Sequence, residues 1–151
     1  MSTESNIYKL LQNTSDISNL HEIETKNIED STYFDYSFNF SGMKFLGSQI
    51  SNPLFTLNKM TVLFRYDLKK ETTRAAILET LNTYNAERPL MNATLANYQG
   101  KKVTIAFSSD FICDDKAINE RQIVPLINIM APSPIDFVNY LEKKKIAIVR
   151  K

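Results

Sequence analysis

The 151-residue chain has one cysteine, one histidine and no tryptophan. A single cysteine excludes an internal disulfide and any zinc site built on several thiolates. A single histidine, His21, excludes a histidine-rich metal centre. The three glycines stand apart at positions 42, 47 and 100, so the chain has no glycine-rich phosphate loop. These absences leave enzymatic chemistry unsupported, and we expect a protein without catalytic residues, metal or cofactor.

The sequence also has no apolar run that approaches the ~20 residues needed by a membrane helix. Its polar opening, with the acidic Glu4, lacks the basic and then apolar segments of a secretory signal peptide. One free thiol, Cys113, agrees with a reducing compartment. We therefore expect a cytoplasmic protein that does not enter a membrane.

The chain also has no large excess of charge of either sign, because eighteen Lys and Arg nearly balance seventeen Asp and Glu, for a net charge of +1. No overall field therefore attracts nucleic acid or an anionic membrane. The charge is uneven, however: residues 1–35 sum to −5, and residues 142–151 hold five basic groups and one acidic. The two ends could contact other molecules, or they could be solvated ends that neutralise each other in a dimer.

The length and the 43% hydrophobic content are those of one globular domain with a core of its own. We interpret residues 1–151 as a single domain in three parts. These are an N-terminal helix with a polar segment (1–31), a core (32–131), and an added helix with a basic tail (132–151).

Alternating apolar and polar side chains predict the strands. Residues 33–40 alternate over eight positions, Ser41-Gly42 supplies a hairpin turn, and residues 43–50 return, with a possible bulge at Gly47. A third strand spans 61–68. A second hairpin pairs 91–98 with 101–108 around Gln99-Gly100.

Apolar spacing of three to four predicts the helices. They cover residues 4–13, 70–84, 116–130 and 134–144, and Pro89 indicates that the second has ended by about Glu87. Ser133 is the expected N-cap of the last helix, and Pro125 lies in the first turn of the third helix or kinks it. Residues 14–31 are polar with few apolar anchors, and a loop, an early strand and a short helix all remain open for them.

We therefore predict an α+β fold in the order α-β-β-β-α-β-β-α. Its sheet has five largely antiparallel strands, with helices on one face. Each predicted element contributes its apolar side to the core, and the expected shared core residues are Phe38, Phe64, Leu81, Ile105 and Ile127.

One cluster, Asp110, Cys113, Asp114 and Asp115, could hold a metal or support an enzyme. The spaced oxygen ligands of a calcium loop are missing from it, and Asp114 or Asp115 suits the role of a cap for the following helix. Cys113 and His21 could form a nucleophile and base, but neither is flanked by a catalytic turn. We expect a capping role for the aspartates.

The order of elements resembles the YbjN family, whose fold is shared with the type III secretion chaperones. The similarity is carried by Leu81-Asn82-Thr83-Tyr84-Asn85, Met91-Asn92-Ala93-Thr94-Leu95, Val103-Thr104-Ile105 and the helix near 123–130. The polar segment 14–31 and the part after Pro134 depart from the pattern. The resemblance implies a bacterial, chaperone-like protein; the secretion chaperones are dimers that hold an extended client segment.

The predicted function is a non-catalytic protein- or peptide-binding module, a chaperone-like adaptor or regulator. One alternative is an inhibitory or nucleic-acid-associated protein that acts through its charged ends, and another is an enzyme that uses residues 110–115. The aromatic strand 33–40 contains no Lys or Arg, which disfavours the binding of nucleic acid to it. The half-apolar outer face of the sheet predicts a homodimer or client surface. Its candidate residues are Leu63, Arg65, Ala96, Tyr98, Thr104 and Ala106.

Overall fold

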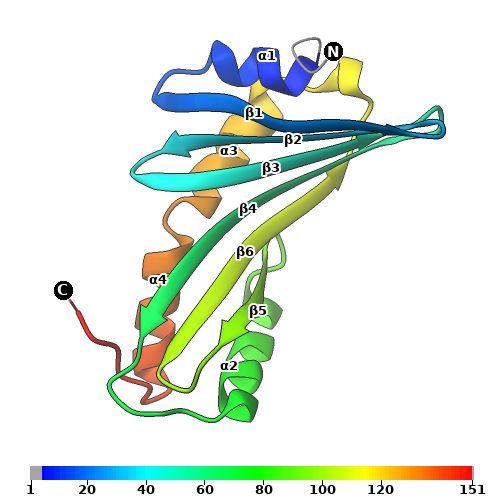
Figure 1. The fold of residues 1–151 in the computed structure, drawn as a ribbon. Helices are drawn as coiled ribbons and strands as arrows, with labels where there is room; N and C mark the ends of the chain where they lie inside the picture. The colour runs from blue at the N-terminus through cyan, green and yellow to red at the C-terminus, as the bar shows by residue number, and fades with distance from the viewer. Residues whose placement is uncertain (1–4, 151) are drawn as a thin grey trace. The chain divides into compact units, whose positions relative to one another are not determined.

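A six-stranded antiparallel sheet carries the helices of this α+β protein in the computed structural model, which describes residues 5–150 (Figure 1). The strand order is β1-β2-β3-β4-β6-β5. The elements follow along the chain as α1 (Asn6–Gln12), β1 (Ile17–Ile28), β2 (Ser31–Phe40), β3 (Met43–Ser51), β4 (Thr56–Asp67), α2 (Arg74–Glu87), β5 (Asn92–Tyr98), β6 (Lys102–Ile112), the 3-10 turn η2 (Asp115–Ala117), α3 (Glu120–Met130) and α4 (Ser133–Lys143). The predicted count of five strands is wrong.

The additional strand is β1, which occupies the segment that the sequence left undecided. Its apolar residues do not alternate, because β1 is an edge strand and most of its side chains are exposed. The register with β2 shifts twice, after Ser18 and after Glu22, and each shift moves the following side chains to the other face. Charged, irregular edges of this kind discourage pairing with other chains.

The hairpins confirm the turn predictions. Phe40 pairs with Met43 across Ser41-Gly42, and both turn residues have positive φ (52° and 77°), as a two-residue hairpin of this type requires. Gln99 and Gly100 also lie in the turn between β5 and β6, where Gln99 N–H donates to the Lys102 carbonyl at 2.8 Å and Gly100 has φ 74°. The third predicted strand begins five residues earlier than expected, at Thr56.

The chain forms two compact units, which are described separately: unit 1 (residues 1–62 and 109–131) and unit 2 (residues 63–108 and 132–151). The single-domain interpretation stays a prediction.

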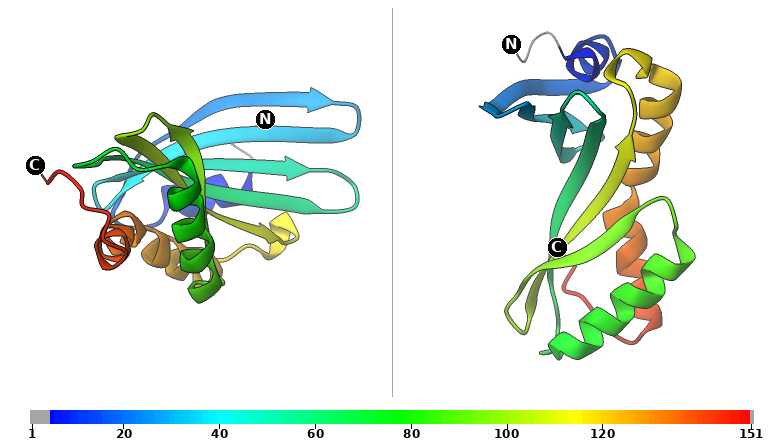
Figure 2. Two further views of the ribbon diagram at one scale, coloured as in Figure 1. Left: turned by 90° about the horizontal axis from the view of Figure 1, so that it is seen from below. Right: turned by 90° about the vertical axis from the view of Figure 1, so that its right-hand side faces the viewer.

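In unit 1, α1 and α3 lie on the same face of the strands (Figure 2). Tyr8 of α1 packs edge-on against Phe34, with ring centroids 5.7 Å apart. Ile123, Ile127 and Met130 bury the inner side of α3. No bulge occurs at Gly47, which pairs with Tyr36, and a Cβ added there would overlap the Tyr36 ring. Glycine is needed at this position to make room for a fully buried tyrosine.

The start of α1 is held from a distant part of the chain. Ser5 makes no side-chain cap, and Asp115 of η2 instead accepts the Asn6 N–H at 3.3 Å. The other Asp115 oxygen accepts from Gln49 Nε2 at 3.1 Å, and the same nitrogen reaches Asn58 Oδ1 at 3.0 Å. A partly buried polar network thus connects α1, η2 and the sheet of unit 1.

In unit 2, α2 and α4 lie on one face of the strands (Figure 2). Tyr84 of α2 is buried between them. The Tyr84 ring lies 5.0 Å from Phe137 and 6.4 Å from Phe107, centroid to centroid. Tyr66 donates its hydroxyl hydrogen to the Pro134 carbonyl at 2.6 Å, which connects β4 to the start of α4.

The predicted core residues Phe38, Leu81, Ile105 and Ile127 are each at most 3% exposed. The prediction is wrong for Phe64, which is half-buried, because at Phe64 β4 has no neighbouring strand on one side. Phe38 and Ile127 belong to unit 1, and Phe64, Leu81 and Ile105 belong to unit 2.

Two helix predictions also need correction. The N-cap of α3 is Asn119, which forms a capping box with Gln122, so Asp114 caps only the 3-10 turn η2. Pro125 lies inside α3, past its first turn. The N-cap of α4 is Pro132 instead of Ser133, and Asp136 of its first turn contacts α2.

Replacing Gly47 by alanine should destabilise the protein by about 3 kcal/mol, because the new Cβ must displace the buried Tyr36 ring. Urea denaturation measures the change. In a Tyr36→Ala background the same replacement should cost little, and an equal cost in both backgrounds would contradict this packing.

Two buried tyrosines should respond differently to the loss of their hydroxyl groups. The Tyr36 hydroxyl has no hydrogen-bond partner among the described residues, so Tyr36→Phe should leave stability unchanged or raise it. Tyr66→Phe loses the bond to Pro134 and should cost about 1 kcal/mol. Urea denaturation of both variants at neutral pH provides the comparison.

Burial also raises the pKa of both hydroxyls above the ordinary value. The folded state therefore favours neutral tyrosine, and this contribution is complete below about pH 10 and declines as the pH rises above it. Tyr36→Phe should retain more stability than the wild type above that pH. Identical alkaline transitions would show that Tyr36 does not contribute.

Candidate functional site

The six residues predicted for a partner surface do not share one face. Leu63 and Arg65 of β4, with Thr104 and Ala106 of β6, alternate with buried neighbours and lie on the face away from the helices. The register of β5 shifts between Leu95 and Asn97, around Ala96. Tyr98 consequently lies on the helix side, where its hydroxyl donates to the Thr72 carbonyl at 2.5 Å.

Beside Leu63 and Arg65, one edge of β4 lacks a neighbouring strand. Pairing with β3 ends at Phe45–Val62. Further along the same edge, the C-terminal segment pairs with β4 through the Leu68–Ile148 bridge, with Lys69 N–H bonded to the Ala147 carbonyl and Val149 N–H to that of Asp67. Among the described residues of unit 2, no strand pairs with this edge at residues 63–66.

The direction of the backbone groups follows from alternation along the strand. Leu68 N–H donates to the Lys101 carbonyl at 2.7 Å, on the side of β6. Asp67 and Lys69 point the opposite way, toward the C-terminal segment. Arg65, two residues before Asp67, therefore directs its N–H and C=O to the open edge.

A groove of about 540 Å³ adjoins this edge. Its apolar lining comes from Phe64 of β4, Ile135 and Val138 of α4, and Val149 of the C-terminal segment. Ile135 is 62% exposed and Val149 47% exposed. Exposed apolar side chains beside unpaired backbone groups suit an extended polypeptide.

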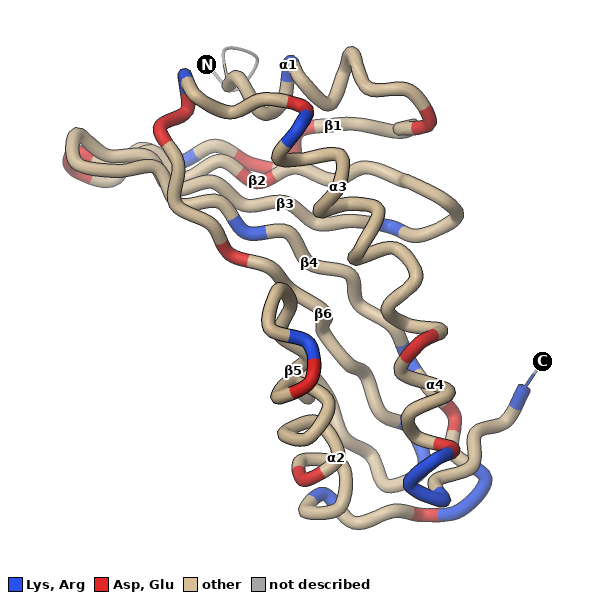
Figure 3. Tube along the Cα trace, turned by 180° about the vertical axis from the view of Figure 1, so that it is seen from behind, with Lys and Arg blue, Asp and Glu red and all other residues tan. Residues whose placement is uncertain are grey.

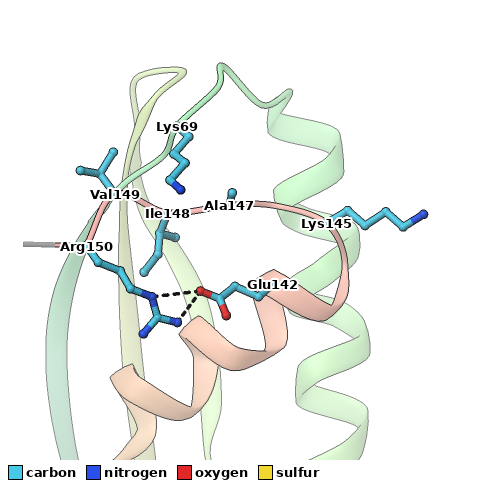
Figure 4. A pocket seen from close by; sticks show the side chains of 7 residues that line it. All are labelled: Lys69, Glu142, Lys145, Ala147, Ile148, Val149 and Arg150. Carbon is cyan, nitrogen blue, oxygen red and sulfur yellow. Dashed lines mark hydrogen bonds and ion pairs between the residues drawn. The ribbon is translucent and has the colours of Figure 1, made fainter.

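Ile148, Val149 and Arg150 of the C-terminal segment line both this groove and a second pocket of about 400 Å³, whose lining Figure 4 shows. Ile148 and Arg150 point toward α4, and Arg150 forms an ion pair with Glu142 (Figure 4). Lys69 reaches into the second pocket and Lys145 points away from it (Figure 4). The polar contacts of the C-terminal segment, residues 146–150, are thus backbone bonds to Asp67, Lys69 and Leu141 and the ion pair of Arg150 with Glu142.

Unit 2 is basic. It contains twelve Lys and Arg and six Asp and Glu, a formal charge of +6. Figure 3 shows the basic residues gathered at the end of α4 and in the loop after β4. Arg65 and Arg150 line the groove itself, with Asp67 3.7 Å from Arg65. Arg150 pairs with Glu142, so it is the net positive charge of unit 2 that favours acidic ligands.

The aspartate cluster does not form a metal site in the described part of the chain, where no three His, Cys, Asp or Glu side chains gather suitably. The expected role as a cap of α3 is wrong for both aspartates: Asp114 caps the 3-10 turn η2, and Asp115 accepts the Asn6 N–H at the start of α1. The structure gives no contact between His21 and Cys113. His21 Nε2 of β1 lies 3.1 Å from the Ser37 hydroxyl of the neighbouring strand β2.

Sequence reasoning missed one cluster, formed by Arg88 after α2 and Asp136 of α4. The guanidinium donates from Nε and Nη2 to the two carboxylate oxygens, at 2.7 and 3.3 Å, and lies 4.2 Å from the Tyr84 ring centroid. Tyr84 also donates to Asp136 at 3.1 Å, and burial followed by the Asp136 charge raises its pKa. Every polar group is paired internally, so the cluster joins two helices.

The chain matches none of the family models, curated proteins or solved structures with which it was compared. Between residues 5 and 150, no helix has the length and apolarity to span a membrane.

Arg88→Lys should destabilise the protein by about 1–2 kcal/mol, because lysine cannot make the two-point contact or stack on Tyr84. Glu87→Gln is the matched control. Its carboxylate is exposed and 3.4 Å from Arg88, so the change should stay within about 0.5 kcal/mol. If Arg88→Lys and Glu87→Gln lower the stability equally in thermal melts, the two-point contact and stacking of Arg88 do not contribute as expected.

Proposed function

We propose that this protein is a non-catalytic adaptor that binds an extended polypeptide segment by adding it as a strand to the open edge of β4. The observation that carries the proposal is the stretch 63–66, which lies beside β6 on one side and has no neighbouring strand among the described residues of unit 2 on the other. Strand addition supplies affinity through the backbone and specificity through pockets for alternate side chains.

The groove defines the class of ligand. Exposed Ile135 and Val149 would bury apolar side chains of the segment, while Arg65 and Arg150 would face carboxylates. The preferred segment is therefore short, extended and free of proline, with apolar residues and at least one Asp or Glu. Its burial would remove the apolar groove from water.

The resemblance to the YbjN family and the type III secretion chaperones supports the same class of function, since those chaperones hold an extended client. The chaperone-like fold itself is part of this proposal. A cytoplasmic location suits an adaptor of this kind.

Selection from a displayed library of random 12-residue peptides provides the probe, with binding of the selected peptide measured by calorimetry. Arg65→Pro removes the N–H that faces the open edge and blocks strand addition, while edge positions tolerate proline in the fold. This variant should lose at least about tenfold in affinity, or about 1.4 kcal/mol.

Arg65→Ala is the matched control, because it removes the charge and keeps the N–H. It should lower the affinity for the selected peptide less than Arg65→Pro does. Both variants should have melting temperatures near that of the wild type. Equal binding by Arg65→Pro and wild type would refute strand addition at this edge.

A further inference from the structure

Four large apolar side chains are exposed at the hairpin end of unit 1. Leu54 is 91% exposed and Ile112 73%, and Phe55 and Ile28 are 42% and 55% exposed. Pairing of Thr32 with Ser51 and the bond from Cys113 N–H to the Thr56 carbonyl bring their segments to the same end of the strands (Figure 2). We call this set the apolar tip. Apolar groups exposed together commonly mark an interaction site.

The apolar tip is acidic. Glu29 and Asp30 occupy the β1–β2 turn (Figure 3), and Asp110 and Asp114 lie near Ile112 in sequence. Unit 1 contains six Lys and Arg and eleven Asp and Glu, a formal charge of −5. This charge opposes an anionic membrane and favours a basic apolar partner.

The loop that carries Leu54 and Phe55 is ordered by its own bonds. Asn52 Oδ1 accepts the N–H groups of Leu54 and Phe55 at 2.8 and 3.0 Å, and Asn52 N–H donates to the Phe55 carbonyl at 3.0 Å. Pro53 restricts the same loop. Little conformational entropy would therefore be lost when it binds.

We infer that the apolar tip of one copy docks into the β4 groove of a second copy. The inference rests on the proposed function, because the occupant uses the same groove as the client segment. Leu54 and Phe55 would contact Ile135, Val138 and Val149, while the acidic surroundings of the tip face Arg65 and Arg150. The opposite charges of the two units, −5 and +6, favour this orientation.

Such a contact is heterologous, since it joins two different surfaces. Each copy retains one free tip and one free groove, so association continues from copy to copy or closes into a ring. This differs from the twofold homodimer expected from the sequence. Docking also covers the groove, so a bound client would dissociate the assembly.

Two variants separate the surfaces. The tip variant, Leu54→Asp with Phe55→Asp, keeps the groove, and the groove variant, Ile135→Asp with Val149→Asp, keeps the tip. All four positions are exposed, so the fold should tolerate the changes. Sedimentation velocity at low salt compares the wild type, each variant and their equimolar mixture.

The average mass of the wild-type species should rise with protein concentration, and each variant alone should remain a 17.4 kDa monomer. The mixture should form a one-to-one complex and nothing larger, because only one intact tip meets one intact groove. High salt should weaken both assemblies.

A wild type that remains monomeric, a mixture that does not associate, or a dimer that survives in both variants would overturn the inference. Binding of the selected peptide to the tip variant separates the two proposals. If the peptide binds the tip variant while the wild type is monomeric, the docking of the tip is refuted and strand addition stands. If the peptide does not bind the tip variant, strand addition is refuted as well.

Discussion

β4 has to satisfy the hydrogen-bonding groups of 12 residues on two sides, and its partners change along its length. β6 neighbours it on one side, while β3 pairs with the other only as far as Val62. The C-terminal segment takes over at Asp67, and the position of that segment places Val149 and Arg150 beside the edge. The open stretch, the groove and its basic lining all follow from this change of partners.

The other edges of the sheet are managed differently. β1 is irregular and carries Glu22, Glu24 and Lys26, and β5 is short with a register shift around Ala96. Bulges and charges of this kind prevent pairing with foreign strands. The stretch 63–66 contains no proline, and exposed apolar side chains adjoin it. Its difference from the protected edges supports the proposal that it has a binding role.

Alternation and helical spacing predict most of the fold, because β2, β4, β6 and α2 each bury one regular side. β1 escaped prediction because an edge strand has no buried face to impose a period. Alternation also placed Leu63 and Arg65 on the outer face. The groove could not be predicted, because Ile135 and Val149 come from distant segments and look like ordinary exposed residues. Tyr98 was misplaced by the shift around Ala96, for which the sequence has no marker such as glycine.

Hydrogen exchange at the Arg65 amide, with and without the selected peptide, tests the central claim most directly. Strand addition predicts that the peptide slows this exchange by about tenfold or more, since the amide would donate to the backbone of the added strand. Leu68, already bonded to Lys101, is the internal reference and should not change. Unchanged exchange at Arg65 with bound peptide would contradict the account.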